Sequence, residues 1–252
     1  MKIQIASDLH IEFPENREYL KKNPLKPCGD ILVLAGDIVP FAQFEKHQDF
    51  FIGLTEKFKS IYWIPGNHEY YKSDIENKSD TMTEKIAENF FLVNNIAVVE
   101  DNIKLIFSTL WSKIGSLHQW VLQQTLTDFH LIKNRGYRFT VNDFNLLHQQ
   151  HLAFLNQELA IDDNFKRVVV THHCPTFINY PEKYKNSFLN EGFATELAEL
   201  IEFVQPEYWI YGHTHFNTPP FKIGNTTLVT NQLGYVAESE NQGFSNEMII
   251  EI

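Results

Sequence analysis

Short runs of apolar residues recur along the chain, and five of them end in a cluster of polar side chains. Runs of this length, rich in Ile, Val and Leu, are typical of buried β-strands. Longer stretches with a different periodicity separate several of the runs, a pattern that indicates an α/β fold. The five predicted strands cover residues 2–6, 31–35, 61–64, 167–171 and 207–211.

Three other segments repeat apolar residues every three or four positions, as on the buried face of an amphipathic helix. They predict helices over residues 43–58, 141–159 and 192–204, the last of which ends before Pro206 because a proline disfavours helical backbone in the residue that precedes it. We also expect a helix over residues 78–92.

The remaining predicted strands are short and bounded by turn residues. Those after residue 220 indicate a second, partly antiparallel sheet that packs on the first. Between residues 111 and 163 the chain becomes rich in Gln, Asn, His and Leu, which suggests a helical insertion or partial lid within a single domain of residues 1–252. These shorter strands cover residues 96–99, 104–109, 221–223, 226–231 and 247–252.

Composition and charge narrow the class of protein. The chain has 252 residues, is 43% hydrophobic and carries a formal net charge of −11. An acidic surface repels phosphate backbones, so binding of duplex nucleic acid is not expected. No stretch approaches the roughly 18 apolar residues of a membrane span. Two cysteines distant in sequence, Cys28 and Cys174, suggest free thiols, and we expect a cytoplasmic protein that binds no membrane.

The polar clusters that follow the five strands contain the residue types that bind metal ions. In an open α/β sheet, ligands bind where loops leave the carboxyl ends of the strands, so clusters distant in sequence converge in space. One residue separates Asp8 from His10 and His213 from His215, and in an extended backbone both members of such a pair point to one face. The other clusters contribute Asp37, Asn67 and His172.

This set of donors predicts two divalent cations and the hydrolysis of a phosphoester. A lone carboxylate such as Asp37 can bridge two cations, and mixed imidazole, carboxylate and carbonyl ligands suit Mn, Fe, Zn, Ni or Co. Two ions about 3.5–4 Å apart clamp both oxygens of an in-line displacement and activate a hydroxide. His68 follows Asn67 and faces the other way, so we expect it to protonate the leaving oxygen. Glycine precedes three ligands, where we expect it to let the strand turn sharply, at Gly36, Gly66 and Gly212.

The motifs and their order resemble those of the calcineurin-like metallophosphoesterase superfamily: D-x-H, G-D, G-N-H-[DE], a His at a strand end and G-H-x-H. The resemblance covers nearly the whole chain and implies two mixed β-sheets packed as a sandwich and flanked by helices. It implies one metal held by Asp8, His10, Asp37 and His215, a second held by Asp37, Asn67, His172 and His213, and His68 as proton donor. Residues 108–111, 171–175 and 231–235 look like those of a bacterial branch whose substrate is not assigned.

The resemblance implies a hydrolase of a small phosphomonoester or phosphodiester, with manganese as the first candidate for the metal. A nuclease or cyclic-nucleotide phosphodiesterase of the same fold is an alternative, and a non-catalytic metal-binding scaffold is an alternative of another class. Such scaffolds typically lose several ligands, whereas every ligand position is filled here. The sequence leaves open the ester type, the substrate and the oligomeric state. His173 could support the ligands or contact substrate, and it could exchange roles with His172. Other side chains that could contact substrate are Tyr70, Tyr71, Trp111, Asn217, Asn231 and Tyr235.

Overall fold

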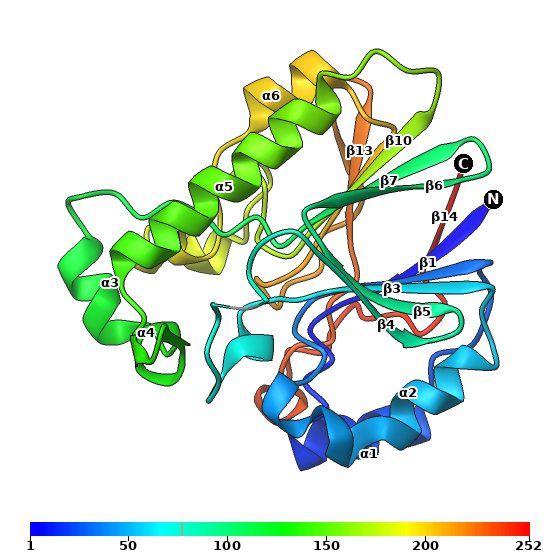
Figure 1. The fold of residues 1–252 in the computed structure, drawn as a ribbon, viewed down its shortest axis with the longest axis horizontal. Helices are drawn as coiled ribbons and strands as arrows, with labels where there is room; N and C mark the ends of the chain where they lie inside the picture. The colour runs from blue at the N-terminus through cyan, green and yellow to red at the C-terminus, as the bar shows by residue number, and fades with distance from the viewer. Residues whose placement is uncertain (77) are drawn as a thin grey trace.

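Two six-stranded mixed sheets pack face to face between two layers of helices (Figure 1). The computed structural model describes residues 1–76 and 78–252. The N- and C-terminal strands lie side by side, because β14 pairs with β1. The sandwich of two mixed sheets expected from the sequence is confirmed.

The first sheet has the strand order β14-β1-β2-β3-β5-β4. Its four central strands are parallel, and the strands at its two edges are antiparallel to their neighbours. The strands are β1 (Lys2–Ala6), β2 (Ile31–Ala35), β3 (Ser60–Ile64), β4 (Met82–Ala87), β5 (Phe90–Asn94) and β14 (Ile249–Glu251).

The second sheet has the order β12-β13-β11-β10-β7-β6 and repeats this plan of four parallel strands between antiparallel edges. The parallel strands of both sheets deliver their carboxyl ends to the region where the ligand clusters gather. The strands are β6 (Ile96–Glu100), β7 (Ile103–Ser108), β10 (Lys166–Thr171), β11 (Tyr208–Tyr211), β12 (Phe221–Ile223) and β13 (Thr226–Thr230).

Helices α1 (Pro14–Lys22) and α2 (Gln48–Thr55) cover the outer face of the first sheet, and α5 (Val141–Leu159) and α6 (Ala198–Val204) cover the second (Figure 1). Among the residues that the structure describes, no helix combines the length and the apolarity needed to cross a membrane. The shorter elements are α3 (Gln119–Thr125), α4 (Asp128–Leu131), the hairpin β8 (Lys133–Asn134) and β9 (Tyr137–Arg138), and 3₁₀ turns at Phe41–His47, His68–Tyr70, Glu182–Tyr184, Phe188–Gly192 and Val236–Glu238.

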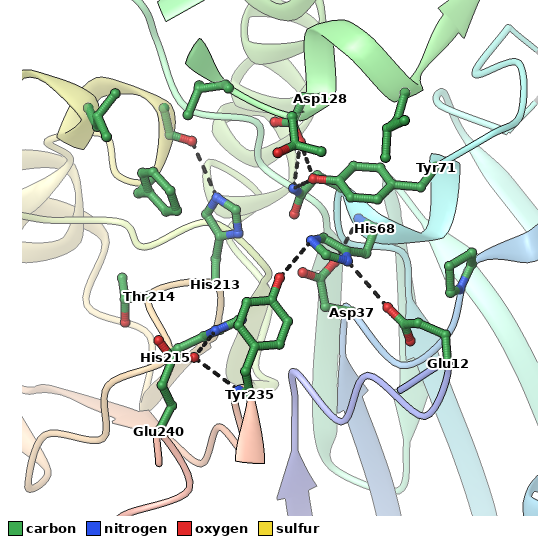
Figure 2. Close-up of a pocket in the computed structure, with 18 of the residues that line it drawn as sticks. Glu12, Asp37, His68, Tyr71, Asp128, His213, Thr214, His215, Tyr235 and Glu240 are labelled. Carbon is green, nitrogen blue, oxygen red and sulfur yellow. Dashed lines mark hydrogen bonds and ion pairs between the residues drawn. The ribbon is translucent and has the colours of Figure 1, made fainter. Parts of the chain in front are cut away.

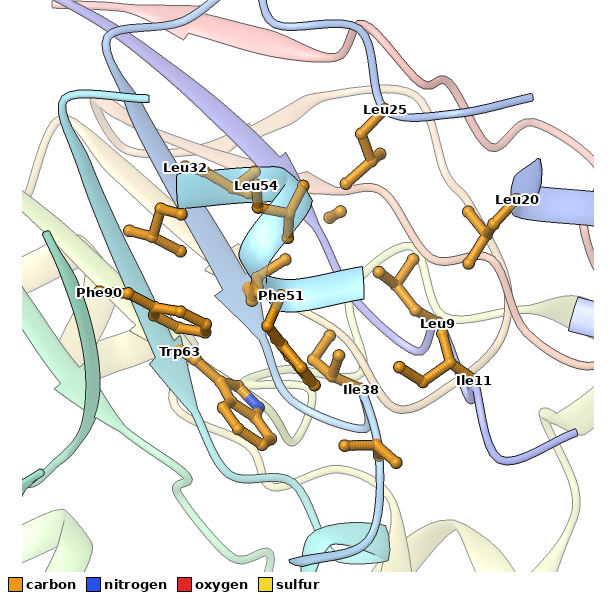
Figure 3. Packing of buried hydrophobic residues seen from close by; sticks show 14 of the residues in the cluster. Leu9, Ile11, Leu20, Leu25, Leu32, Ile38, Phe51, Leu54, Trp63 and Phe90 are labelled. Atoms are coloured by element: carbon orange, nitrogen blue, oxygen red, sulfur yellow. The ribbon is translucent and has the colours of Figure 1, made fainter. Parts of the chain in front are cut away.

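Successive side chains of the central strands point to opposite faces, so apolar side chains pack on both sides of each sheet. Ile5 and Val33 point into the layer between the sheets, where they share a cluster with Phe107 of the second sheet. The opposite face of the first sheet packs on α1 and α2, with the rings of Phe51 and Trp63 stacked 5.3 Å apart (Figure 3). Strands buried on both faces read as continuous apolar runs, which is why the sequence located them.

The segment 78–92, expected to be a helix, is instead the antiparallel hairpin of β4 and β5. Phe90 and Leu92 on β5 are buried in the core, whereas no residue of the edge strand β4 is buried and the middle of the strand is exposed. An exposed edge strand carries polar residues and lacks a clear alternation of apolar and polar positions, so this strand could not be recognised from its sequence. Asn89 anchors the turn by donating a 2.7 Å hydrogen bond to the carbonyl of Phe58.

Two further expected helices are shorter than their periodicity suggested. The segment 43–58 contains a 3₁₀ turn followed by α2, which ends at Thr55. The segment 192–204 is helical only from Ala198, because the residues before it pair with the loop after β10 through the bonds Thr195 N–H to Cys174 O and Leu197 N–H to Pro175 O. Backbone pairing with a neighbouring loop thus overrides helical spacing there.

The segment 111–163 contains α3, α4, the β8–β9 hairpin and α5. Helix α5 has the predicted bounds and begins with a capping box in which Thr140 and Asp143 satisfy each other's backbone N–H groups. It packs against β7 through Leu155, beside Ile106, on the outer face of the second sheet. Helices α3 and α4 contribute Leu122 and Phe129 to a second apolar cluster, which also contains Phe144 of α5.

Candidate metal centre

The expected ligands lie in the loops that follow the carboxyl ends of β1, β2, β3, β10 and β11. Figure 2 shows three of them, Asp37, His213 and His215, around one cavity. Five of the expected ligands have left-handed backbone, with φ of 54° at Asp8, 45° at His10, 56° at Asp37, 74° at His213 and 47° at His215. The extended geometry expected for the two spaced pairs is therefore wrong, since both strands end before them. The pairs still converge, and His10 Nε2 lies 3.0 Å from His215 Nε2.

The donor atoms form two neighbouring groups that share Asp37. Asp8, His10, Asp37 and His215 offer atoms within 4.8 Å of one another, and Asp37, His172 and His213 do the same. Asp37 Oδ2 lies 3.7 Å from His10 Nε2, while Asp37 Oδ1 lies 3.4 Å from His172 Nε2. The carboxylate therefore faces one group with each oxygen.

Asn67 belongs to the second group through its side-chain carbonyl. Its Oδ1 lies 3.2 Å from His172 Nε2, which itself lies 3.1 Å from His213 Nδ1. All seven residues expected as ligands come together in this way, and most of them are fully buried. The donor set of imidazole, carboxylate and carbonyl groups fits divalent cations of the Mn–Zn series.

Each of the four histidines in these groups is fixed through its outer ring nitrogen. His172 Nδ1 donates to the carbonyl of Ala35 at 2.9 Å, and His213 Nε2 donates to the carbonyl of Gly192 at 3.3 Å. In the same way His215 Nδ1 bonds Glu240 at 2.6 Å and His10 Nδ1 bonds Glu12 at 3.3 Å. Such contacts set the tautomer and leave the inner nitrogen free to bind a metal.

The carboxylates of the centre are held in their ionised form. Burial raises the pKa of Asp37, but the charges of His172, His68 and His10 outweigh it, so this pKa lies well below its usual value. Burial likewise opposes ionisation of Asp8, yet its hydrogen bond with His215 and the charges of His172 and His215 lower its pKa. Ionised carboxylates are the form that binds cations.

Two glycines leave the space in which the donors meet. A Cβ on Gly66 would lie 2.2 Å from Asp37 Oδ1 and 2.6 Å from His172 Nε2. A Cβ on Gly212 would lie 2.6 Å from Asp8 Oδ2. Of the three glycines that precede ligands, only Gly36 has the positive φ of a sharp turn, at 89°. At Gly66 and Gly212 the reason for glycine is clearance for the neighbouring donor atoms.

Glu69 braces two of the ligand loops, a role the sequence analysis missed. Its buried carboxylate accepts hydrogen bonds from the N–H groups of Asp37, Ile38 and Gly66 at 2.6–2.9 Å, and from Trp63 Nε1 at 3.1 Å. Burial and the charge of Asp37 raise the pKa of Glu69 to about 8. Its place at the end of the G-N-H-E motif was the one available signal.

Asp128, on α4, holds Asn67 in place. Its Oδ1 accepts hydrogen bonds from Asn67 Nδ2 and from the Tyr71 hydroxyl, each at 2.8 Å (Figure 2). Because the amide nitrogen is engaged there, the carbonyl oxygen of Asn67 is turned toward His172. No motif marks Asp128, which comes from the segment predicted as an insertion.

His68 lies beside these groups and faces a cavity. Its ring packs 4.0 Å from that of Tyr71, Nδ1 lies 3.3 Å from Glu12 Oε1, and Nε2 lies 3.2 Å from the Tyr235 hydroxyl (Figure 2). Burial lowers the pKa of His68, but the negative charges of Asp37 and Glu12 outweigh it and the net shift is upward.

Three of the residues named as possible substrate contacts lie away from the cavity. Tyr70 is fully buried and donates to the carbonyl of Lys78, and Trp111 is buried in the same apolar cluster. Asn217 bonds the backbone of Gln232. None of the three lines the cavity beside the centre, whereas Tyr71 and Tyr235 do.

His173 is packed behind the centre. Its Nδ1 accepts a hydrogen bond from Ser112 N–H at 3.2 Å, and its ring lies 4.2 Å from that of His213. Burial and the charges of His213 and His172 hold its pKa well below the usual value. The structure thus brings His172, and not His173, to the donor groups.

Comparison with known sequences gives two similar proteins. Uncharacterized protein L509 of Acanthamoeba polyphaga mimivirus is 32% identical over 272 aligned positions, covering 95% of this chain and 93% of that protein. UPF0046 protein K07C11.7 of Caenorhabditis elegans is 24% identical over 237 positions, covering 91% of this chain and 68% of that protein.

Solved structures share the fold. The phosphopantetheinyl hydrolase of Mycobacterium tuberculosis superposes with a TM-score of 0.72 at 16% identity, over 100% of this chain and 95% of that one. A dimetal phosphatase of Danio rerio gives a TM-score of 0.51 at 15% identity, over 92% and 87% of the two chains. The family model described as Calcineurin-like phosphoesterase matches residues 1–217. Together with the ordered ligand motifs, this match shows that the chain belongs to the calcineurin-like phosphoesterase family.

Proposed function

We propose that this protein is a metal-dependent phosphoesterase that hydrolyses a small phosphomonoester or phosphodiester at a binuclear centre. The observation that carries the proposal is the position of Asp37, whose two carboxylate oxygens face two different groups of donor atoms. In this assignment Asp37 bridges. Asp8, His10 and His215 complete one site, and Asn67, His172 and His213 complete the other.

The donor arrangement supports a preformed centre. The inner nitrogens of the four histidines point to the shared region because Ala35, Gly192, Glu12 and Glu240 hold the outer ones. Two divalent cations bound there would supply positive charge to the phosphoryl oxygens and an activated water molecule. Manganese is our first candidate, since carboxylate and carbonyl oxygens form part of the set and no thiolate does.

His68 is proposed to give the proton that the leaving oxygen requires. Its Nε2 is directed at the cavity and shares a hydrogen bond with Tyr235, and its Nδ1 is held by Glu12. The carboxylate of Glu12 fixes the ring and favours its protonated state, as for a general acid.

A metal-loading panel tests the proposal. Protein freed of metal is dialysed against Mn²⁺, Ni²⁺, Zn²⁺ or Mg²⁺, its metal content is measured, and nitrophenyl phosphate and bis(nitrophenyl) phosphate are offered. We expect about two equivalents of metal and metal-dependent release of nitrophenolate. Two bound equivalents without hydrolysis of either ester would instead support the metal-binding scaffold.

A further inference from the structure

The cavity beside the centre is much larger than a phosphate group. Its volume is about 600 Å³. Cavities that bind small organic molecules span roughly 300–1,000 Å³, so this one has room for the organic part of an ester. Its lining includes candidate ligand residues, His68 and two chain segments, 126–131 and 180–193.

These two segments present an apolar and aromatic wall. The first contributes Leu126 and Leu131, and the second contributes Tyr184, Leu189 and Phe193. The ring of Phe193 stacks on that of the ligand His213 with 4.7 Å between centroids, so the apolar wall begins at the metal centre itself.

The two segments are packed directly on each other. A Cβ on Gly192 would lie 2.5 Å from Leu126 Cδ1, and the carbonyl of Gly192 holds His213. The wall is thus tied to the ligands and forms a fixed part of the cavity.

Positive charge is scarce in this cavity. Among the lining residues that the structure describes, Lys72 is the single lysine or arginine, whereas Glu12, Asp37, Asp128 and Glu240 are acidic. A substrate with a second phosphate or a carboxylate would find no arginine fork to neutralise it and would lie near carboxylates. A chain with a net charge of −11 adds to this disadvantage.

We infer that the site takes esters with a single phosphate group whose organic part is uncharged and largely apolar, packed against the wall of Leu126, Leu131, Tyr184, Leu189 and Phe193. The inference rests on the proposed function, since it assigns the phosphate to the metal centre. It excludes nucleoside polyphosphates and phosphorylated carboxylic acids as good substrates.

Binding of phosphonates tests whether the apolar wall contributes to ligand affinity, independently of catalysis. Calorimetry on the Mn²⁺-loaded protein compares methylphosphonate, hexylphosphonate and 5-carboxypentylphosphonate. Each buried CH₂ contributes about 0.8 kcal/mol, so hexylphosphonate should bind at least tenfold more tightly than methylphosphonate even if half of the chain is in contact. The terminal carboxylate should cost at least tenfold in affinity. Equal binding of all three would overturn the inference.

Hydrolysis is measured with the ethyl, butyl and hexyl diesters of nitrophenyl phosphate, which share one leaving group. We expect kcat/KM to rise from ethyl to hexyl by at least tenfold. Leu189→Gln should reduce both this ratio and the preference for hexylphosphonate. Leu117→Gln, at a side chain that is 84% exposed and outside the cavity, should preserve them.

The outcomes separate the two proposals. Hydrolysis without any dependence on chain length overturns the substrate class and leaves the phosphoesterase standing. No hydrolysis of any ester with any of the four metals overturns the proposed function, and the substrate class with it.

Discussion

Replacing Asp128 by alanine should weaken metal binding although Asp128 is not itself one of the proposed metal ligands. Asp128 accepts the 2.8 Å hydrogen bonds of both Asn67 and Tyr71, so the substitution removes the shared acceptor and leaves Asn67 Nδ2 with its longer 3.3 Å bond to the Tyr71 hydroxyl. A buried donor that loses its partner costs about 1–3 kcal/mol. Removal of the buried carboxylate, whose pKa burial raises, offsets part of this. We expect a loss of about 1–3 kcal/mol in unfolding free energy for the metal-free protein.

Metal affinity should fall because the side-chain amide of Asn67 loses the hydrogen bond to Asp128 that orients it. Loss of a group that orients a ligand typically costs 10–100-fold in metal affinity, and only one of the two sites should show it. The assay is calorimetric titration of metal-free protein with Mn²⁺, with thermal unfolding followed by circular dichroism.

Two variants serve as controls for Asp128→Ala. Asp128→Asn keeps an acceptor oxygen and should retain most of the affinity, while Tyr71→Phe keeps the bond between Asn67 and Asp128. If Asp128→Ala binds two equivalents as tightly as the wild type, or if Tyr71→Phe weakens binding equally, the orienting role is refuted.

Three further substitutions probe the centre. Asp37→Asn should reduce bound manganese below two equivalents by elemental analysis, and a variant that still holds two would contradict the bridging position. His68→Ala should keep both metals but slow alkyl phosphates about 10²–10⁴-fold more than nitrophenyl phosphate, and equal losses would remove it as general acid. Gly66→Ala places a methyl group 2.2 Å from Asp37 Oδ1 and should lower metal affinity and the melting temperature, whereas Gly53→Ala, which meets no atom within 4 Å, should not.

The candidate ligands could be predicted from the sequence because two independent patterns coincide at them. Buried parallel strands appear as apolar runs, and the residue types that bind metals follow those runs directly. His172 lies at the end of β10 and Asp37 just beyond β2, so knowing the strands is nearly enough to know where these side chains lie. The same logic fails for β4, whose exposed residues resemble those of a polar helix.

The residues that hold the ligands could not be predicted in this way. Glu240 and Asp128 approach the centre from a C-terminal loop and from α4, and their hydrogen bonds join positions 25 and 61 residues apart in sequence. Gly192 acts through its backbone carbonyl, which every residue possesses, so its identity carries no signal for that contact. A sequence reveals which residues can bind a metal more readily than what orients them.

The strained backbone of the ligands explains why so many such contacts are needed. A non-glycine residue in the left-handed region costs about 1–3 kcal/mol, and such strain persists only where the surroundings over-determine it. Here the loops hold one another: Asp8 N–H bonds the carbonyl of Gly36, His10 N–H bonds that of Asp37, and His213 N–H bonds the carboxylate of Asp8. The loops after β1, β2 and β11 are therefore fixed as a set. A change in one ligand loop should shift the backbone of the others, because these left-handed residues depend on hydrogen bonds to loops that follow other strands.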